Sequence, residues 1–175
     1  MHRLFFALWP DATLRRGIAE AAEALPAIRA AGGRAEAADR YHLTVQFLGD
    51  FHALAPAVLD APGAAATSVS ALPAFELLLD RIGSFSAGRV LWIGCGAPSP
   101  QLLQLHRHLG EALAGVGFAS KAPPTFIPHL TLRRHAHGAI EQAIPPLRWW
   151  ARDFVLIDST AGAYRIVGRW RLAGA

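Results

Sequence analysis

The sequence predicts an α+β fold of two pseudo-symmetric lobes, and three observations support this prediction. The tripeptide His-Leu-Thr occurs twice, at residues 42–44 and 129–131. Each copy follows an apolar segment at the same spacing, because Phe5 precedes His42 by 37 residues and Trp92 precedes His129 by 37 residues. In both halves the order is strand, helix, His-Leu-Thr strand, helix and strand. This repetition indicates an internal duplication, in which the two motifs face each other.

The first half begins with an apolar run at residues 4–9, closed by Pro10, which is typical of a buried strand. Residues 11–30 then carry apolar side chains at helical spacing, with Asp11 as a candidate N-cap and Gly32-Gly33 as the end. The other elements expected in this half are a strand at residues 41–49, a helix at 54–69 that is interrupted near Pro62-Gly63, and a strand at 75–82.

The second half repeats this order. Residues 90–95 form an apolar strand, and Ser99 followed by Pro100 is a typical helix start. The leucines that follow keep helical spacing up to Gly117, and Pro123-Pro124 separates this helix from the next strand. The remaining expected elements are a strand at residues 126–133 with the second motif, a short helix from Gly138, and strands at 154–158 and 164–172.

Composition is consistent with a single bilobal domain that covers residues 1–175, because 53% of the residues are hydrophobic and only 17% are charged. No apolar run approaches the roughly 20 residues that span a bilayer, and the first ten residues lack the pattern of a signal peptide. The only cysteine, Cys95, lies in a buried-strand pattern and is expected to be an inert thiol. These features favour a cytoplasmic protein.

The chain has a formal net charge of +4, and arginine supplies most of its positive charge. Arginine binds phosphate oxygens in a bidentate manner. A modest positive excess is therefore compatible with a polyanionic substrate, although it does not identify one.

The repeated motif itself carries the chemistry. Side chains at positions i and i+2 of a strand share one face, so His42 lies with Thr44, and His129 lies with Thr131. Two imidazoles on opposite walls of a groove suit phosphodiester cleavage, because one can accept a proton from water while the other donates one to the leaving oxygen. The threonine hydroxyls can stabilise the charge that develops on the phosphate, so no metal and no cofactor is expected.

Several segments, in the same order along nearly the whole chain, resemble the LigT-like RNA 2′,3′-cyclic phosphodiesterases, a branch of the two-histidine (2H) phosphoesterases. The first His-Leu-Thr is followed by Phe-Leu-Gly after two residues, which makes the resemblance specific. The segments that carry it are residues 3–8, 42–50, 89–92, 105–106 and 128–132.

This resemblance implies a bilobal α+β fold in which each lobe is an antiparallel sheet with helices on its outer face, around a central groove. It implies hydrolysis of RNA 2′,3′-cyclic phosphate ends to 2′-phosphomonoesters by a monomer, without metal. His42 is then the proton donor to the leaving 3′ oxygen, His129 is the base that activates water, and Thr44 and Thr131 bind the phosphate. Some members of the family also join tRNA halves through a 2′–5′ linkage.

The phosphate-binding arginine is ambiguous in the sequence. Strand alternation puts Arg133 on the face of His129, whereas the family pattern resembles an arginine at Arg134, which a bulge would reconcile. We favour Arg134. The chain also departs from the family before the first motif, where it has residues 34–40 in place of a tryptophan-containing stretch, and after it, where Gln46 replaces a residue that is often basic. These departures predict less positive charge on the groove wall.

Other interpretations stay open at this level. The motif residues alone do not show which histidine is the donor and which is the base. A module that binds RNA ends without turnover would keep the same groove. A metal-dependent phosphohydrolase is the third alternative, although neither pair of the remaining histidines has a third ligand at regular spacing; these pairs are His106 with His108, and His135 with His137.

Overall fold

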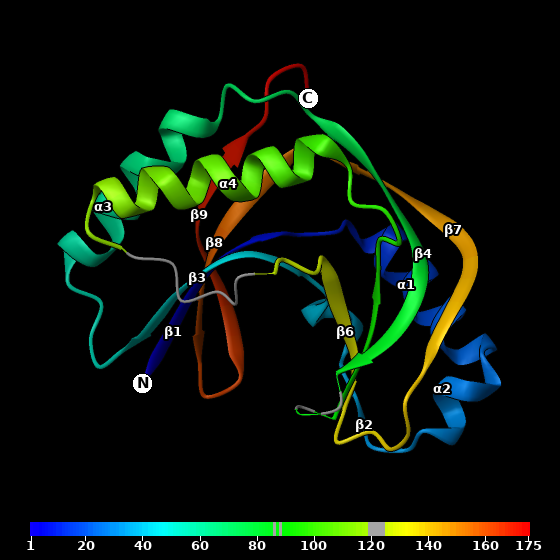
Figure 1. Ribbon diagram of the computed structural model, residues 1–175. Coiled ribbons are helices and arrows are strands. Elements are labelled where there is room, and N and C mark those ends of the chain that lie inside the picture. The colour runs from blue at the N-terminus through cyan, green and yellow to red at the C-terminus, as the bar shows by residue number, and fades with distance from the viewer. Residues whose placement is uncertain (86, 88, 119–124) are drawn as a thin grey trace.

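The computed structural model describes residues 1–85, 87, 89–118 and 125–175, and Figure 1 shows two sheets side by side. All pairings between the named strands are antiparallel. The first sheet has the order β3 (Leu43–Phe51), β1 (His2–Leu8), β8 (Asp153–Thr160), β9 (Ala163–Arg171). The second has the order β2 (Arg34–Ala35), β6 (His129–Arg134), β5 (Val90–Gly94), β4 (Phe75–Phe85), β7 (Glu141–Ala151). The predicted α+β class is confirmed.

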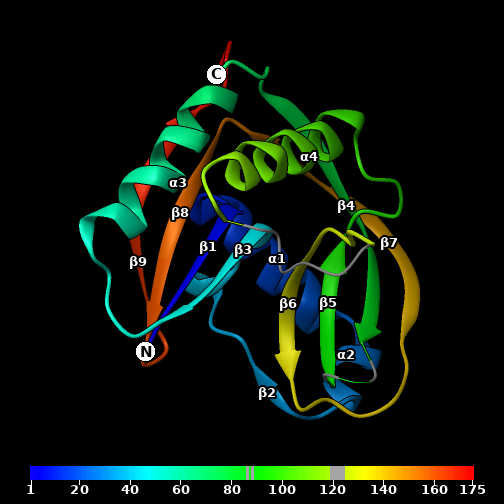
Figure 2. The ribbon, with the colours of Figure 1, turned by 60° about the vertical axis from the view of Figure 1, so that its left-hand side comes forward.

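In the described residues, four helices pack outside the sheets, and the two predicted helix N-caps are confirmed. The carboxylate of Asp11 accepts a hydrogen bond from the Leu14 amide at 2.8 Å, and the Ser99 hydroxyl accepts one from the Leu102 amide at 3.2 Å. In Figure 2, α3 and α4 cover the first sheet, and α1 and α2 lie behind the second. Their bounds are α1 (Ala12–Ala24), α2 (Pro26–Ala30), α3 (Pro56–Val69) and α4 (Pro100–Gly115), and a 3₁₀ turn, η1 (Ala38–Arg40), precedes β3.

The two halves of the chain exchange strands. β4 ends the first half, yet it pairs with β5 in the second sheet, and β8 from the second half pairs with β1 in the first sheet. One cluster of buried side chains consequently runs through both sheets, with Leu4 and Phe154 from the first, and Leu77 and Leu130 from the second. None of the helices that the structure describes is long and apolar enough to cross a bilayer.

Three predictions about the elements are wrong. The helix expected over residues 11–30 is divided at Leu25, because Pro26 cannot continue α1 and instead begins α2. The helix over residues 56–69 is not interrupted at Pro62-Gly63; proline removes one backbone donor, but the packing of α3 against α4 and β9 maintains the helix through Pro62. The short helix expected from Gly138 does not form either. The edge strand β7 occupies residues 141–151, and its prolines lie where its pairing with β4 shifts register, a position where a missing amide is tolerated. Pro123-Pro124 lies outside the described residues.

Candidate active site

The two motif histidines are held in the same way. His42 directly precedes β3 and His129 is the first residue of β6. The Nδ1 atom of His42 lies 2.7 Å from the carbonyl oxygen of Arg40, and the Nδ1 atom of His129 lies 2.7 Å from that of Ile127. A carbonyl oxygen can only accept, so each Nδ1 carries the proton and donates it. Each Nε2 atom therefore keeps an unprotonated lone pair that is available for proton transfer.

Aromatic rings surround both imidazoles. The ring of His42 lies 4.9 Å from that of Phe5, 5.3 Å from that of Tyr164 and, nearly parallel, 6.0 Å from that of Trp9. The ring of His129 lies 4.8 Å from that of Phe85 and 6.2 Å from that of Trp92. Phe5 and Trp92 are the residues that precede the histidines by the same spacing, so the repeat seen in the sequence corresponds to a repeated ring contact.

Burial controls the protonation of both histidines. Burial, supported by the electrostatic effects of Arg134 and His129, lowers the pKa of His42 from 6.5 to about 4, against the opposing effects of the Arg40 carbonyl and the Glu36 carboxylate. Burial also lowers the pKa of His129, and Arg134 acts in the same direction. In the protein without substrate, both imidazoles are therefore neutral at pH 7. The guanidinium of Arg134 therefore acts on the pKa of both imidazoles.

Each threonine of the motif lies on the same sheet face as its histidine. Thr44 is paired with Ala7, whose side chain belongs to the small cluster that contains Phe5. Thr131 is paired with Trp92, which contacts His129. Both threonines are half-buried, so the two hydroxyls lie along the groove face beside the imidazoles.

A β-bulge follows each motif at the equivalent position. The pairing of β1 with β3 skips Val45, and the pairing of β5 with β6 skips Leu132. Both skipped side chains are buried in the core. Because an extra residue reverses the alternation of the side chains that follow it, the bulge in β6 turns Arg134, rather than Arg133, toward the groove.

The side chains at the next position of both strands point away from the groove. The guanidinium of Arg133 donates to the carbonyl oxygens of Gly32 at 2.6 Å and Gly33 at 3.0 Å. The amide of Gln46 is buried and donates to the His106 carbonyl at 2.8 Å. The expectation that Gln46 reduces the positive charge of the groove wall is therefore wrong, because this side chain lies on the helix-covered face of the sheet.

A buried carboxylate joins the two walls of the site. Glu36 is only 8% exposed, and its Oε2 accepts a hydrogen bond from Arg134 Nε at 2.9 Å. Its Oε1 lies 3.0 Å from Arg40 Nε, and the Arg40 guanidinium lies 4.5 Å above the ring of Tyr164, which raises the pKa of Arg40. Tyr164 in turn contacts His42 edge-on. A chain of contacts thus connects Arg134 to His42.

Sequence reasoning missed Glu36, Arg40 and Tyr164 as members of the site. Glu36 and Arg40 had one signal, since opposite charges four residues apart often pair. No sequence signal pointed to Tyr164, because this residue lies in β9 and contacts His42 only as a result of the strand order of the first sheet.

The remaining histidines do not form a metal site in the part of the chain that is described, where no three His, Cys, Asp or Glu side chains are placed to hold an ion. His106 stacks on Phe126 at 4.0 Å, and its Nδ1 lies 2.7 Å from the Val45 carbonyl oxygen. Cys95 is buried, and burial raises the pKa of its thiol to about 11. An unactivated thiol of this kind is not a nucleophile.

Comparison with known proteins identifies the family. Residues 10–163 match the 2′-5′ RNA ligase superfamily. The chain belongs to this superfamily. A superfamily member from Escherichia coli (strain K12), an RNA 2′,3′-cyclic phosphodiesterase, is 36% identical over 178 residues, which cover 97% of this chain and 96% of the relative. The resemblance inferred from the motifs is thereby confirmed.

Solved structures of similar proteins have the same fold. The crystal structure of E. coli LigT complexed with 3′-AMP superposes with a TM-score of 0.81 at 32% identity, and the match covers 98% of each chain. A structure described as a phosphoesterase gives a TM-score of 0.79 at 32% identity, covering 98% of this chain and 99% of that chain. The α+β fold with two antiparallel sheets therefore matches these structures over nearly the full length.

Proposed function

We propose that this chain hydrolyses RNA 2′,3′-cyclic phosphate ends to 2′-phosphomonoesters without a metal. The observation that carries the proposal is the matched pair of imidazoles, each fixed by an Nδ1–H bond to a carbonyl and each left with a free Nε2. The E. coli relative named for this activity supports the choice of substrate. LigT structures complexed with 3′-AMP and with phosphate are consistent with it. Because one chain supplies both histidines, a monomer carries the whole pair.

The proposed reaction is a single displacement at phosphorus. One neutral imidazole takes a proton from water through Nε2 as the water oxygen attacks, and the bond from phosphorus to the 3′ oxygen breaks. The other imidazole, protonated, gives its Nε2 proton to the departing 3′ oxygen, so the phosphate remains on the 2′ oxygen. The family resemblance assigns donation to His42 and water activation to His129. Each proton transfer is worth roughly 10²–10⁴-fold.

The non-bridging oxygens of the phosphate require hydrogen-bond donors, because negative charge develops on them during the reaction. Thr44, Thr131 and Arg134 are the proposed ones, because the two hydroxyls lie on the faces of the histidines and the guanidinium influences both imidazoles. Fixed donors of this kind stabilise the charge of a five-coordinate transition state. Glu36 fixes the orientation of Arg134 through the 2.9 Å bond.

The donor must acquire its proton when substrate binds. A phosphate anion beside His42 favours the charged imidazole and raises its pKa, in opposition to burial. We therefore expect the pH dependence of kcat/KM, which reflects the free protein, to have an acidic limb near pH 4, and the profile of kcat to lie at higher pH.

Two alternative functions would use the same site. Ligation through a 2′–5′ linkage is favoured as a second activity by the superfamily to which the chain belongs; it uses the same two proton transfers with a ribose hydroxyl in place of water. A module that binds RNA ends without turnover would retain affinity for the same RNA and form no product.

The deciding experiment uses an RNA oligonucleotide with a 2′,3′-cyclic phosphate end, incubated in EDTA, with identification of the product. A 2′-phosphate that is lost in His42→Ala and in His129→Ala, and retained in the matched control His52→Ala on an exposed loop, supports the proposal. Product formed only when a divalent metal is restored, or formed equally by either motif variant, contradicts it. RNA that binds without product identifies the non-catalytic module.

A further inference from the structure

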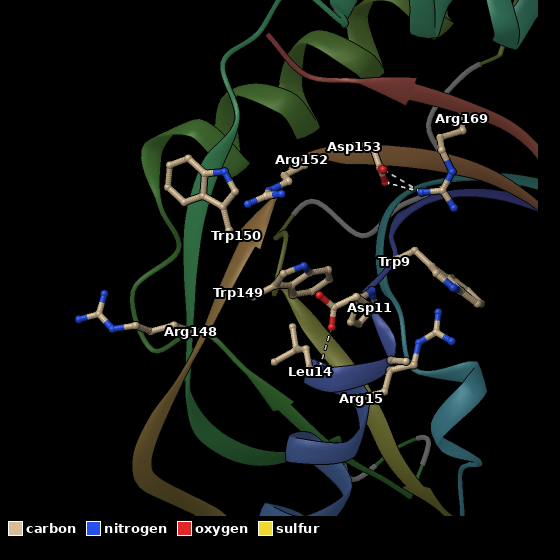
Figure 3. A pocket seen from close by; sticks show the side chains of 12 residues that line it. Trp9, Asp11, Leu14, Arg15, Arg148, Trp149, Trp150, Arg152, Asp153 and Arg169 are labelled. Carbon is tan, nitrogen blue, oxygen red and sulfur yellow. Dashed lines mark hydrogen bonds and ion pairs between the residues drawn. The ribbon is translucent and has the colours of Figure 1, made fainter. Parts of the chain in front are cut away.

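A second cavity, of about 600 Å³, lies beside the candidate active site. It is lined by the first turn of α1, the end of β7 and the start of β8. Figure 3 shows Trp9 and Arg15 on one side of this cavity and Trp150 and Arg152 on the other.

The cavity continues the groove face on which His42 lies. Trp9 is shared, because its ring stacks on that of His42 and also lines the cavity. Arg169 is paired with Val155, whose side chain clusters with Phe5 on the face that contacts His42. Side chains paired directly across strands share a face, so Arg169 lies on the same face of the first sheet as Phe5, and Trp9 contacts both the His42 imidazole and the cavity.

The cavity carries an excess of positive charge. Its walls hold four arginines and two aspartates. Asp153 is paired with Arg169 at 2.7 Å, Arg148 is paired with Glu76 outside the cavity at 2.8 Å, and Asp11 accepts the helix-capping bond.

Two guanidiniums remain. Among the described residues, neither Arg15 nor Arg152 has a salt-bridge partner within 4.0 Å, although the carboxylates of Asp39 and Asp11 act electrostatically on Arg15. The Nε atom of Arg15 is buried without a hydrogen-bond partner, while its guanidinium lies 4.6 Å from the ring of Trp9. Arg152 is exposed at the mouth. A site with an excess of guanidinium groups is suited to an anionic ligand.

An exposed aromatic surface lies beside these arginines in the cavity wall. The indole of Trp150 is 50% exposed, which is unusual for the largest side chain, and it lies next to Arg152 in the wall. Exposed indole beside guanidinium matches single-stranded nucleic acid, in which phosphates alternate with bases that stack on aromatic rings. A simple anion site needs no exposed indole.

We propose that this cavity binds the nucleotide that precedes the cyclic phosphate end of an RNA strand, with Arg152 and Arg15 on its phosphate and Trp150 under its base. The inference rests on the proposed function, because it requires the RNA end to occupy the groove. It specifies the substrate class: an oligonucleotide is preferred over a cyclic mononucleotide, which has nothing to place in the cavity.

The test compares two substrates, adenosine 2′,3′-cyclic phosphate and a short RNA oligonucleotide with the same end. Trp150→Ala is expected to raise KM for the oligonucleotide by about 5- to 150-fold, and Arg152→Glu by about tenfold or more, with kcat unchanged. Neither variant changes kcat/KM for the mononucleotide, which also shows that the variants fold. The matched control is Arg16→Glu, the same charge reversal on an exposed α1 residue outside the cavity.

The inference is overturned if the variants change both substrates equally, if neither substrate is affected, or if Arg16→Glu acts like Arg152→Glu. Binding of RNA that ends in a 2′-phosphate, measured by fluorescence anisotropy against salt, separates this inference from the activity. Arg152→Glu should lower the slope of log Kd against log salt concentration by about 0.7. If the wild type hydrolyses neither substrate, the proposed function fails, and this binding series still decides whether the cavity holds RNA.

Discussion

The buried imidazole of His42 should make the folded protein sensitive to mild acid. Folding lowers its pKa from 6.5 to about 4, so between these values the unfolded chain binds a proton that the folded protein does not. Stability from the neutral, buried form is thus fully present above pH 6.5 and is lost as the pH falls toward 4. At pH 5 the loss is about 2 kcal/mol, from one and a half pH units at about 1.36 kcal/mol each.

Urea unfolding at pH 7.5 and pH 5 measures this loss, with His42→Gln as the comparison. The glutamine amide can donate to the Arg40 carbonyl in place of Nδ1 and does not titrate. The wild type should lose about 2 kcal/mol more than His42→Gln between the two pH values, and contributions of other groups cancel in the difference. His52→Gln, which removes an exposed imidazole, should behave like the wild type. An equal loss in wild type and His42→Gln would refute the reasoning.

Three further predictions concern the surroundings of the site. Glu36→Gln should lower kcat about tenfold, because Arg134 loses its fixed orientation; an unchanged kcat in steady-state assays contradicts this. Trp9→Leu should admit water to His42 and move the acidic limb of kcat/KM from near pH 4 toward pH 6.5, so a limb that stays in place argues against burial as the cause. Gly83→Ala should destabilise the protein by about 1–3 kcal/mol in urea unfolding, since the added methyl group would overlap the Trp92 ring behind His129; unaltered stability would show that the ring moves freely.

The sequence predicted those features that depend on local pattern. Alternation and apolar spacing were sufficient for β1, β3 and β5, and the caps at Asp11 and Ser99 marked the starts of two helices. β7 was missed, and a short helix was expected from Gly138 in its place, because the two prolines of β7 are compatible with a strand only at the edge of a sheet.

The site was harder to predict where strand geometry departs from regular alternation. Regular alternation favoured Arg133 as the groove residue, and only the bulge at Leu132 shows why Arg134 faces the histidines. The equivalent bulge at Val45 explains why the side chain of Gln46 points away from the groove. Neither bulge has a local signature such as glycine or proline, so neither could be read from the sequence.

The exchange of strands between the halves has a consequence for synthesis of the protein. β1 leaves the ribosome first but must wait for its partner β8, which begins at Asp153, before the first sheet can be completed. Tyr164, which contacts His42, arrives later still. Pairings this distant along the chain slow folding. A nascent chain therefore exposes its first His-Leu-Thr motif long before that motif has its aromatic surroundings, so the site is completed only after β9 has been synthesised.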